Sequence, residues 1–279
     1  MRLLIISGRS GSGKSAALHM LEDLDYYCVD NLPVHLLPHL LECMKGKQNY
    51  IAISIDARNL PGNENELPAL IKELRNDYQD VDIIYLDADN NTLLKRFSET
   101  RRKHPLGKNT LKDAIELETH LLEPIANSAD LQIDTSHMTT KELREIVYSR
   151  IYKKSELLPS LLFQSFGYKR GIPIDTDYTF DIRCLPNPYW EKSLREKTGS
   201  DQAVIDFFES QKPVEAMYND IKNFIEKWLP AFEKESRKYL TISIGCTGGQ
   251  HRSVYLVDKL AAHFLQQRDN VLVRHRELS

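Results

Sequence analysis

Short apolar runs alternate with helical patterns along the first half of the chain. The runs are rich in β-branched residues, as buried strands are, and the stretches between them carry apolar residues at helical spacing. This alternation indicates an α/β fold, in which helices cover both faces of a parallel sheet. The predicted strands are Arg2–Ser7, Tyr26–Asp30, Tyr50–Asp56, Ile83–Asp87 and Leu131–Asp134, and the predicted helices are Lys14–Leu24, Pro33–Lys45, Leu67–Asp77, Asn91–Arg101, Leu111–Asn127 and Thr139–Tyr152.

The second half shows the same alternation with fewer strands. Lys153–Pro159 is predicted to be the domain boundary, because it follows a long helix and ends in a proline that halts helix propagation. We therefore expect two domains, residues 1–153 and 154–279, the second a smaller α/β domain. Its predicted strands are Tyr178–Arg183, Tyr239–Gly245 and Val271–Arg274, and its predicted helices are Gln202–Glu209, Val214–Lys234 and Arg252–Gln267, with a proline-rich turn at Leu185–Pro188.

A glycine-rich loop follows the first predicted strand and matches the P-loop pattern G-x-x-x-x-G-K-[ST] in full. Glycines let the backbone aim its N–H groups at phosphate oxygens, and the helix that begins near Lys14 adds its positive end. Lys14 is expected to reach the β- and γ-phosphates, and Ser15 to bind Mg²⁺. The context predicts a P-loop NTPase-like domain rather than a glycine turn that binds nothing. The predicted nucleotide-binding residues are Gly8, Arg9, Ser10, Gly11, Ser12, Gly13, Lys14 and Ser15.

The metal of a P-loop needs a second, acidic partner at the end of a strand. Asp87 and Asp56 each close a predicted strand and are the candidates, although for either one alone a strand-terminal or helix-capping aspartate is the better explanation. Arg101 and Arg102 end a predicted helix. They would close over phosphates, as in small-molecule kinases, or would simply complement the helix C-terminus.

A second glycine-rich loop, Gly245–Ser253, lies between a predicted strand and a predicted helix. Such a turn is an anion site, to which Arg252 adds a planar fork and His251 and Thr247 add further donors. The spacing Cys-x5-Arg-Ser also matches the phosphate loop of cysteine-dependent phosphatases, in which a thiolate attacks phosphorus. Their usual histidine is replaced by Gly245, and no general-acid aspartate can be placed. Anion binding is therefore favoured over ester hydrolysis, and a plain strand-to-helix turn is the remaining alternative.

Composition limits the function classes and cellular locations that fit this chain. The net charge of −3 and the pI of about 6.3 argue against a protein that is basic all over, but leave room for a local basic patch. The four cysteines form no CxxC pair, so we expect reduced thiols in a reducing compartment. No apolar run approaches the roughly 20 residues that span a bilayer, and the N-terminal one is too short for a signal peptide. These features predict a cytoplasmic protein.

Eight short segments, taken in order, resemble one protein family along nearly the whole chain. It is the RapZ/YvcJ type of P-loop nucleotide-binding protein, which includes bacterial RNase adapters. The P-loop alone is unspecific, whereas the ordered set is highly specific. The segments are Ser7–Ser15, Tyr27–Pro33, Leu86–Asp89, Asp134–Ser136, Ser165–Lys169, Gly171–Asp175, Leu185–Pro188 and Ile244–Gly249.

The resemblance implies an adapter that binds a regulatory small RNA and presents it to the endoribonuclease RNase E. That RNA controls synthesis of glucosamine-6-phosphate synthase, so the adapter would respond to glucosamine-6-phosphate. The resemblance also implies a homotetramer built from C-terminal contacts. It places ATP at Gly8–Ser15 and a guanine-nucleotide contact at Asp56, Ala57, Arg58 and Asn59.

The resemblance further assigns the second domain both a sugar-phosphate pocket and an RNA-binding segment. The pocket would use the second glycine loop, with Asp181 holding the amino group of the sugar. A few cations per protomer would bind RNA weakly, and four copies would compensate. The pocket residues are Asp181, Cys246, Thr247, Gly248, Gly249, His251 and Arg252, and the RNA-binding residues are Gln266, Gln267, Arg268, Arg274, His275 and Arg276. Candidates to extend the RNA surface, or else merely solvated cations, are Lys169, Arg170, Lys192, Arg195 and Lys197.

Two other function classes stay open. A small-molecule P-loop kinase would consume ATP only when a phosphoryl acceptor is present. A phosphatase that uses Cys246 and Arg252 would lose ester hydrolysis, but not ligand binding, on replacement of Cys246 by Ser. The adapter hypothesis itself allows slow nucleotide hydrolysis, because a P-loop and Mg²⁺ supply some of the positioning.

Overall fold

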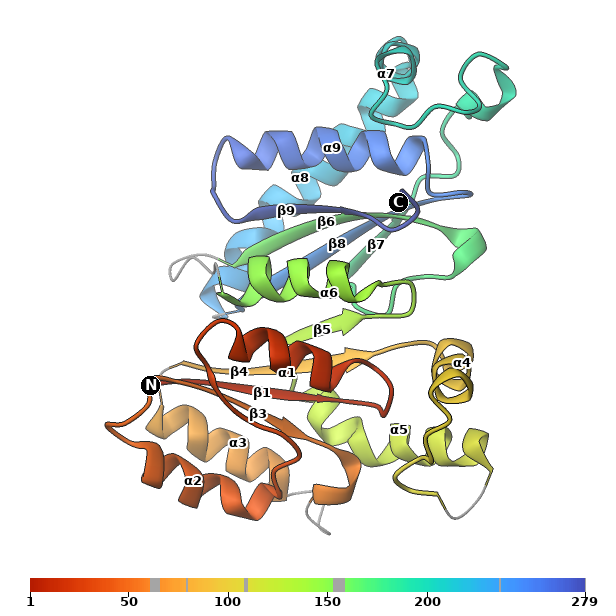
Figure 1. Ribbon diagram of the computed structural model, residues 1–279. Coiled ribbons are helices and arrows are strands. Elements are labelled where there is room, and N and C mark those ends of the chain that lie inside the picture. The colour runs from red at the N-terminus through yellow and green to blue at the C-terminus, as the bar shows by residue number, and fades with distance from the viewer. Residues whose placement is uncertain (61–65, 79, 108–109, 153–158, 236, 279) are drawn as a thin grey trace. The chain divides into compact units, whose positions relative to one another are not determined.

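The computed structural model describes residues 1–60, 66–78, 80–107, 110–152, 159–235 and 237–278. The chain divides into two compact units, Met1–Tyr152 and Lys153–Ser279 (Figure 1). Of the predicted boundary segment, only Pro159 falls within the described residues. In the part of the chain that the structure describes, no helix is both long and apolar enough to cross a membrane.

The first unit is built on a five-stranded parallel sheet of order β2-β3-β1-β4-β5. Figure 1 shows α1 and α6 on one face of this sheet and α2, α3 and α5 on the other. The strands are β1 (Arg2–Gly8), β2 (Tyr27–Val29), β3 (Tyr50–Ile55), β4 (Asp80–Asp87) and β5 (Leu131–Asp134). The helices are α1 (Lys14–Glu22), α2 (Leu37–Met44), α3 (Glu66–Asp77), α4 (Asn90–Thr100), α5 (Leu111–Asn127) and α6 (Thr140–Ile146).

The central position of β1 explains its sequence. Leu3 to Ile6 are all at most 1% exposed, because neighbouring strands and both helix layers cover them. Its end is aligned with its neighbours, since Ser7 pairs with Ile55 of β3 and Gly8 with Leu86 of β4. The residues after β1, β3 and β4 therefore meet at one edge of the sheet.

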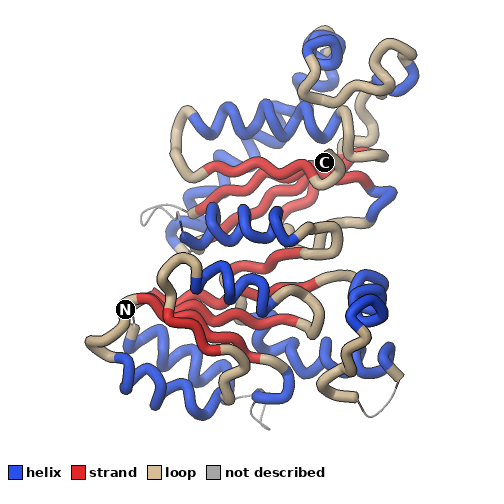
Figure 2. The backbone as a smooth tube through the Cα atoms, viewed as in Figure 1, coloured by secondary structure: helices blue, strands red, loops and turns tan. Residues whose placement is uncertain are grey.

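The second unit has a four-stranded parallel sheet of order β7-β8-β6-β9 (Figure 2). The central strands β6 and β8 are buried along their whole length, and α9 packs on them. The strands are β6 (Ser160–Gly167), β7 (Tyr178–Asp181), β8 (Tyr239–Cys246) and β9 (Val271–His275), and the helices are α7 (Gln202–Glu209), α8 (Lys212–Lys234) and α9 (Arg252–Leu265).

Adjacent strands β6 and β8 send their connections in opposite directions, β6 toward β7 and β8 toward β9. Ligands of open α/β sheets bind outside the carboxyl ends of such a strand pair. Gly167 and Cys246 are paired at these ends, so the turns that follow them lie together.

The predicted α/β fold class is confirmed, and most predicted elements lie within a few residues of the observed ones. One strand was missed, and one predicted helix differs in kind over its second half. The strand β6 was not predicted, although it lies at the centre of the second sheet. The helix predicted over Thr139–Tyr152 is instead α6 followed by a π-helix, Val147–Tyr152.

Candidate functional site

Gly8–Ser15 joins β1 to α1 in backbone conformations that only glycine adopts easily. The φ angle is 144° at Gly8 and 108° at Gly13. A Cβ at Gly8 would lie 2.0 Å from the carbonyl oxygen of Leu86, so the loop lies directly against β4. The helix α1 begins at Lys14 and turns its positive end toward the loop. The strand–loop–helix geometry of a P-loop is therefore present.

Lys14 lies across the interior of this loop. Its Nζ donates hydrogen bonds to the carbonyl oxygens of Gly8, at 2.6 Å, and Arg9, at 3.2 Å. Burial lowers the pKa of Lys14, and the carboxylates of Glu118, Asp56 and Asp30 oppose that shift. The loop thus holds a largely buried cation, surrounded by its own carbonyls, which polyphosphate oxygens would replace.

The side chain of Arg9 fixes the loop to the end of β4. Its Nε donates to Asp87 Oδ1 at 2.6 Å, one terminal nitrogen donates to Asn90 Oδ1 at 2.5 Å, and the other donates to the carbonyl oxygen of Ala88. The ion pair is mostly buried, and burial raises the pKa of Asp87 despite the guanidinium beside it. Arg9 and the N–H of Ala88 therefore both engage Oδ1 of Asp87.

A fully buried glutamate supports the loop from α5. Glu118 accepts hydrogen bonds from the backbone N–H of Ser10 at 2.8 Å and from its hydroxyl at 2.7 Å. His104 Nε2 lies 3.2 Å from the same carboxylate. The N–H of Leu106 donates to His104 Nδ1 at 3.2 Å, so the ring proton is on Nε2 and points to Glu118. Sequence reasoning missed both residues, because neither belongs to a local motif.

The segment predicted to contact a guanine nucleotide is internally paired. Asp56 caps the 3-10 helix Ala57–Asn59 by accepting the N–H of Arg58 at 2.9 Å, and the Arg58 guanidinium binds both oxygens of the same carboxylate at 2.5–3.2 Å. Although burial raises it, these hydrogen bonds hold the pKa of Asp56 below its usual value. Asn59 donates to the carbonyl oxygen of Asn31 at 3.0 Å. The guanine contact stays a prediction.

Asp30 and the predicted pair Arg101 and Arg102 differ in their surroundings. Asp30, which was not predicted, follows β2, and its Oδ2 lies 3.5 Å from Ser15 Oγ. Arg101 and Arg102, in contrast, are exposed at the end of α4, where Arg101 takes a φ of 51°. Another arginine of α4, Arg96, holds the P-loop instead, donating to the carbonyl oxygen of Gly11 at 2.9 Å.

In the second unit, the turn between β8 and α9 presents its middle to solvent. Thr247 and Gly248 are exposed, and a Cβ built on Gly248 would meet no atom of the described residues within 4 Å. A Cβ on Gly167 would lie 2.7 Å from the carbonyl carbon of Gly248, so the turns after β6 and β8 touch backbone to backbone. Cys246 lies beneath them, buried, and its Sγ accepts the N–H of Gly249 at 3.2 Å.

The predicted anion ligands His251 and Arg252 are buried and bind neighbouring loops. One terminal nitrogen of Arg252 donates to the carbonyl oxygens of Arg183 at 2.8 Å and Leu185 at 3.1 Å, and the other donates to Thr247 Oγ1 at 3.2 Å. His251 Nε2 lies 3.1 Å from the carbonyl oxygen of Leu194. Arg252 therefore shapes the glycine turn, and only part of its fork faces Thr247.

Asp181, predicted to hold a sugar amino group, is paired with an arginine. The Arg183 guanidinium binds both of its oxygens at 2.7–3.0 Å, and hydrogen bonding from Arg183 lowers the pKa of Asp181. The same guanidinium lies 4.0 Å above the ring of Tyr168. Arg183, which sequence reasoning missed, thus links Asp181 to Tyr168, a residue also missed, in the turn after β6.

Several predicted RNA-binding residues have protein partners. Arg268 is buried and pairs with Glu233 at 2.6 Å. Arg274 lies 3.6 Å from Asp175, and the ring nitrogens of His275 lie 2.9 Å from Ser165 Oγ and 3.0 Å from Asp258. Gln266 and Gln267 are exposed at the end of α9, and the N–H of Arg276 donates to the carbonyl oxygen of Ser165 at 3.1 Å.

The parallel strands bring other cations to one edge of the second sheet. Lys169 and Arg170 are exposed after β6, Arg183 is exposed after β7, and Arg276 follows β9. The exposed turn Thr247–Gly248 follows β8, which lies between β6 and β7. This carboxyl edge, formed by the residues just after the four strands, brings these cations beside the glycine turn, together with the carboxylates of Asp181 and Glu277.

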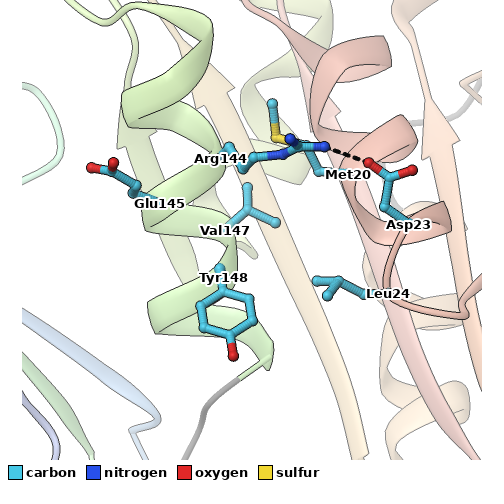
Figure 3. Close-up of a pocket in the computed structure, with 7 residues that line it drawn as sticks. All are labelled: Met20, Asp23, Leu24, Arg144, Glu145, Val147 and Tyr148. Carbon is cyan, nitrogen blue, oxygen red and sulfur yellow. Dashed lines mark hydrogen bonds and ion pairs between the residues drawn. The ribbon is translucent and has the colours of Figure 1, made fainter.

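A groove of about 270 Å³ opens in the first unit between α1 and the helical segment formed by α6 and the π-helix that follows it (Figure 3). The guanidinium of Arg144 and the carboxylate of Asp23 form an ion pair at its rim. None of the residues predicted from the sequence to bind ligand lines it. The lining residues are Met20, Asp23, Leu24, Arg144, Glu145, Val147 and Tyr148.

Comparison with known proteins identifies the family. Residues 1–155 match the model of the RapZ-like N-terminal domain, and residues 159–279 match that of the RapZ C-terminal domain. The chain belongs to the RapZ-like family. A protein of Pseudomonas putida is 52% identical over 284 residues, and one of Hahella chejuensis is 52% identical over 287. Both are named nucleotide-binding protein, and each alignment covers all of both chains.

Two solved structures of distant sequence align with about half of the RapZ-like chain. YorR of Bacillus subtilis, in complex with phosphorylated GDP, has a TM-score of 0.40 at 16% identity, over 52% of this chain and 92% of its own. A shikimate kinase of Bacteroides thetaiotaomicron has a TM-score of 0.37 at 13% identity, over 55% of this chain and 97% of its own. Likenesses this distant carry no argument about function.

Proposed function

We propose that this RapZ-like chain is a cytoplasmic, nucleotide-binding RNA adapter. It binds ATP or GTP with Mg²⁺ at the P-loop and a regulatory small RNA through the second unit. It presents that RNA to RNase E as a homotetramer and responds to glucosamine-6-phosphate, thereby controlling glucosamine-6-phosphate synthase. Membership of the family over both units supports this reading.

The observation that carries the nucleotide site is the position of Lys14. Its ammonium lies inside the P-loop against two backbone carbonyls, at the N-terminal end of α1. A cation, main-chain amides and a helix N-terminus there converge on the place where polyphosphate binds. The adapter function requires no phosphoryl acceptor, so we expect nucleotide turnover to be slow and incidental.

The RNA and sugar-phosphate functions are supported by the carboxyl edge of the second sheet. Phosphate groups of both ligands would be recognised by the same chemistry, an exposed glycine turn with the exposed cations Lys169 and Arg170 in the neighbouring turn. Because several predicted RNA-binding side chains at the C-terminus are paired within the protein, we place more of the RNA contact at this edge.

An electrophoretic shift with the regulatory RNA tests this placement. Replacing both Lys169 and Arg170 by Ala should weaken binding and lower the slope of log affinity against log salt by about 1.5, since each phosphate contact contributes about 0.7–0.9. The matched control replaces Lys45 and Lys47, two exposed lysines of the first unit. Unchanged affinity and salt slope in the Lys169/Arg170 variant would contradict the proposed RNA surface.

A further inference from the structure

Four carboxylates surround the P-loop, and their partners distinguish them. Asp87 is paired with Arg9 at 2.6 Å, and both oxygens of Asp56 are bound by Arg58. Glu118 is fully buried and accepts two hydrogen bonds from Ser10. The two aspartates expected to assist the metal are thus paired with arginines, and the glutamate is committed to the loop itself.

Asp30 is differently placed. It follows β2, is exposed to solvent, and turns its Oδ2 toward Ser15 Oγ at 3.5 Å. Its other oxygen, Oδ1, accepts a hydrogen bond from the hydroxyl of Ser54 on β3. That hydroxyl in turn accepts the N–H of Asn31 at 2.7 Å, which fixes its direction. The carboxylate is therefore oriented toward the P-loop serine by a neighbouring strand.

We propose that Asp30, with the Ser15 hydroxyl, is the protein ligand set for the Mg²⁺ of the bound nucleotide. This inference rests on the proposed nucleotide site. Mg²⁺ takes hard oxygen ligands at about 2.1 Å in octahedral geometry, so neighbouring ligand oxygens lie about 3 Å apart. The 3.5 Å between Asp30 Oδ2 and Ser15 Oγ fits such a pair after a small adjustment. Magnesium is usually held by one or two carboxylates together with substrate phosphates, which matches a single aspartate here.

Ser54 acts through Asp30 and is a positioning residue. Its hydroxyl holds Oδ1, so that the carboxylate presents Oδ2 to Ser15. Without this hydroxyl, the Asp30 carboxylate stays near Ser15 but is free to rotate. The Ser54→Ala variant should therefore lower the gain in ATP affinity that Mg²⁺ provides, but by less than Asp30→Asn does. Residues that hold a metal ligand in position act on metal affinity in this indirect way.

The test compares ATP affinity in Mg²⁺ with ATP affinity in EDTA, by calorimetry on the full chain. We expect wild-type protein to bind ATP more tightly with the metal. The Asp30→Asn variant should lose about tenfold or more of that gain and keep its affinity in EDTA. Affinity in EDTA also reports that the variant is folded. Substituting Mn²⁺ and recording its electron paramagnetic resonance spectrum in the ATP complex gives a second readout, which Asp30→Asn should change.

Two variants serve as comparisons. Glu22→Gln removes an exposed acid from the same helix as Ser15 and should leave the metal gain intact. Asp56→Asn should also retain the gain, since Arg58 already binds that carboxylate. The inference would be overturned if the Asp30→Asn variant kept the full Mg²⁺-dependent gain in ATP affinity. It would also be overturned if Asp56→Asn lost that gain and Asp30→Asn did not. If wild-type protein binds ATP in neither condition, the proposed nucleotide site fails, whereas ATP binding with no metal gain overturns only the role of Asp30.

Discussion

The guanidinium groups of Arg9, Arg252 and Arg268 look equivalent in the sequence, as cations of phosphate or RNA sites. Their contacts separate them. Arg9 is buried against Asp87, Arg268 is buried against Glu233, and Arg252 binds two backbone carbonyls as well as Thr247. At the scale of the residue, the number of donors already used decides what an arginine has left for a ligand.

Arg9→Met should destabilise the fold and make its stability depend on pH. Without the guanidinium, a mostly buried Asp87 carboxylate is left uncompensated, at a cost of about 3–5 kcal/mol at neutral pH. Burial raises the pKa of Asp87, and removing Arg9 raises it further. A folded-state pKa above the unfolded value favours the fold at low pH, so the deficit should shrink as pH falls through that folded-state pKa.

Urea unfolding at pH 7 and pH 5 measures this effect. The matched control is Arg75→Met, which removes the more exposed pair with Asp130 and should cost less than about 1 kcal/mol at both pH values. Equal losses in the two variants, or a deficit in Arg9→Met that grows on acidification, would contradict the assignment of Arg9 as a buried anchor.

At the scale of the element, helical spacing and short apolar runs in the sequence predict most of this fold. These patterns failed at β6, whose run contains Gln164 and Ser165 and no β-branched residue. The strand β8 is equally buried, but its run of apolar and β-branched residues was recognised. The candidate sites divide in the same way. The glycine loops were recognisable as local motifs, whereas Glu118 and Asp30 contact the P-loop from other segments of the chain, which no local pattern records.

The Gly8→Ala variant tests whether the P-loop excludes a side chain at its first glycine, which an ordinary glycine turn would accept at lower cost. The new Cβ would lie 2.0 Å from the carbonyl oxygen of Leu86 at a φ of 144°, so the loop must move away from β4. We expect a loss of stability on the order of 3 kcal/mol, together with loss of ATP binding.

The control for this change is Gly46→Ala. Gly46 also has a positive φ, 76°, but a Cβ there would meet no atom of the described residues within 4 Å. It should lower stability by about 1 kcal/mol and leave ATP affinity unchanged. Thermal unfolding and nucleotide titration of both variants check the prediction, and equal behaviour would argue against a close fit at Gly8.

At the scale of the whole molecule, both units use one plan. In chain order, the first four strands of each sheet are arranged second-third-first-fourth, β2-β3-β1-β4 and β7-β8-β6-β9. Each unit places a glycine turn before a helix, beside a strand whose end carries an Asp-x-Arg pair, Asp56 with Arg58 and Asp181 with Arg183. The residues named for each candidate site therefore all come from one unit.

This construction predicts that the two sites fail separately. Lys14→Met should abolish ATP binding, because it removes the cation inside the P-loop, and leave the affinity for glucosamine-6-phosphate unchanged. Arg252→Ala should release the carbonyls of Arg183 and Leu185 and weaken glucosamine-6-phosphate binding by about 2 kcal/mol or more, while ATP binding is retained. Titrating both ligands into both full-length variants gives the four affinities. If either single change removed both ligands, the sites would not be independent. If the affinities do separate, any effect of ATP on RNA affinity in the wild type is a coupling free energy between two separate sites, and RNA must alter ATP affinity by the same factor.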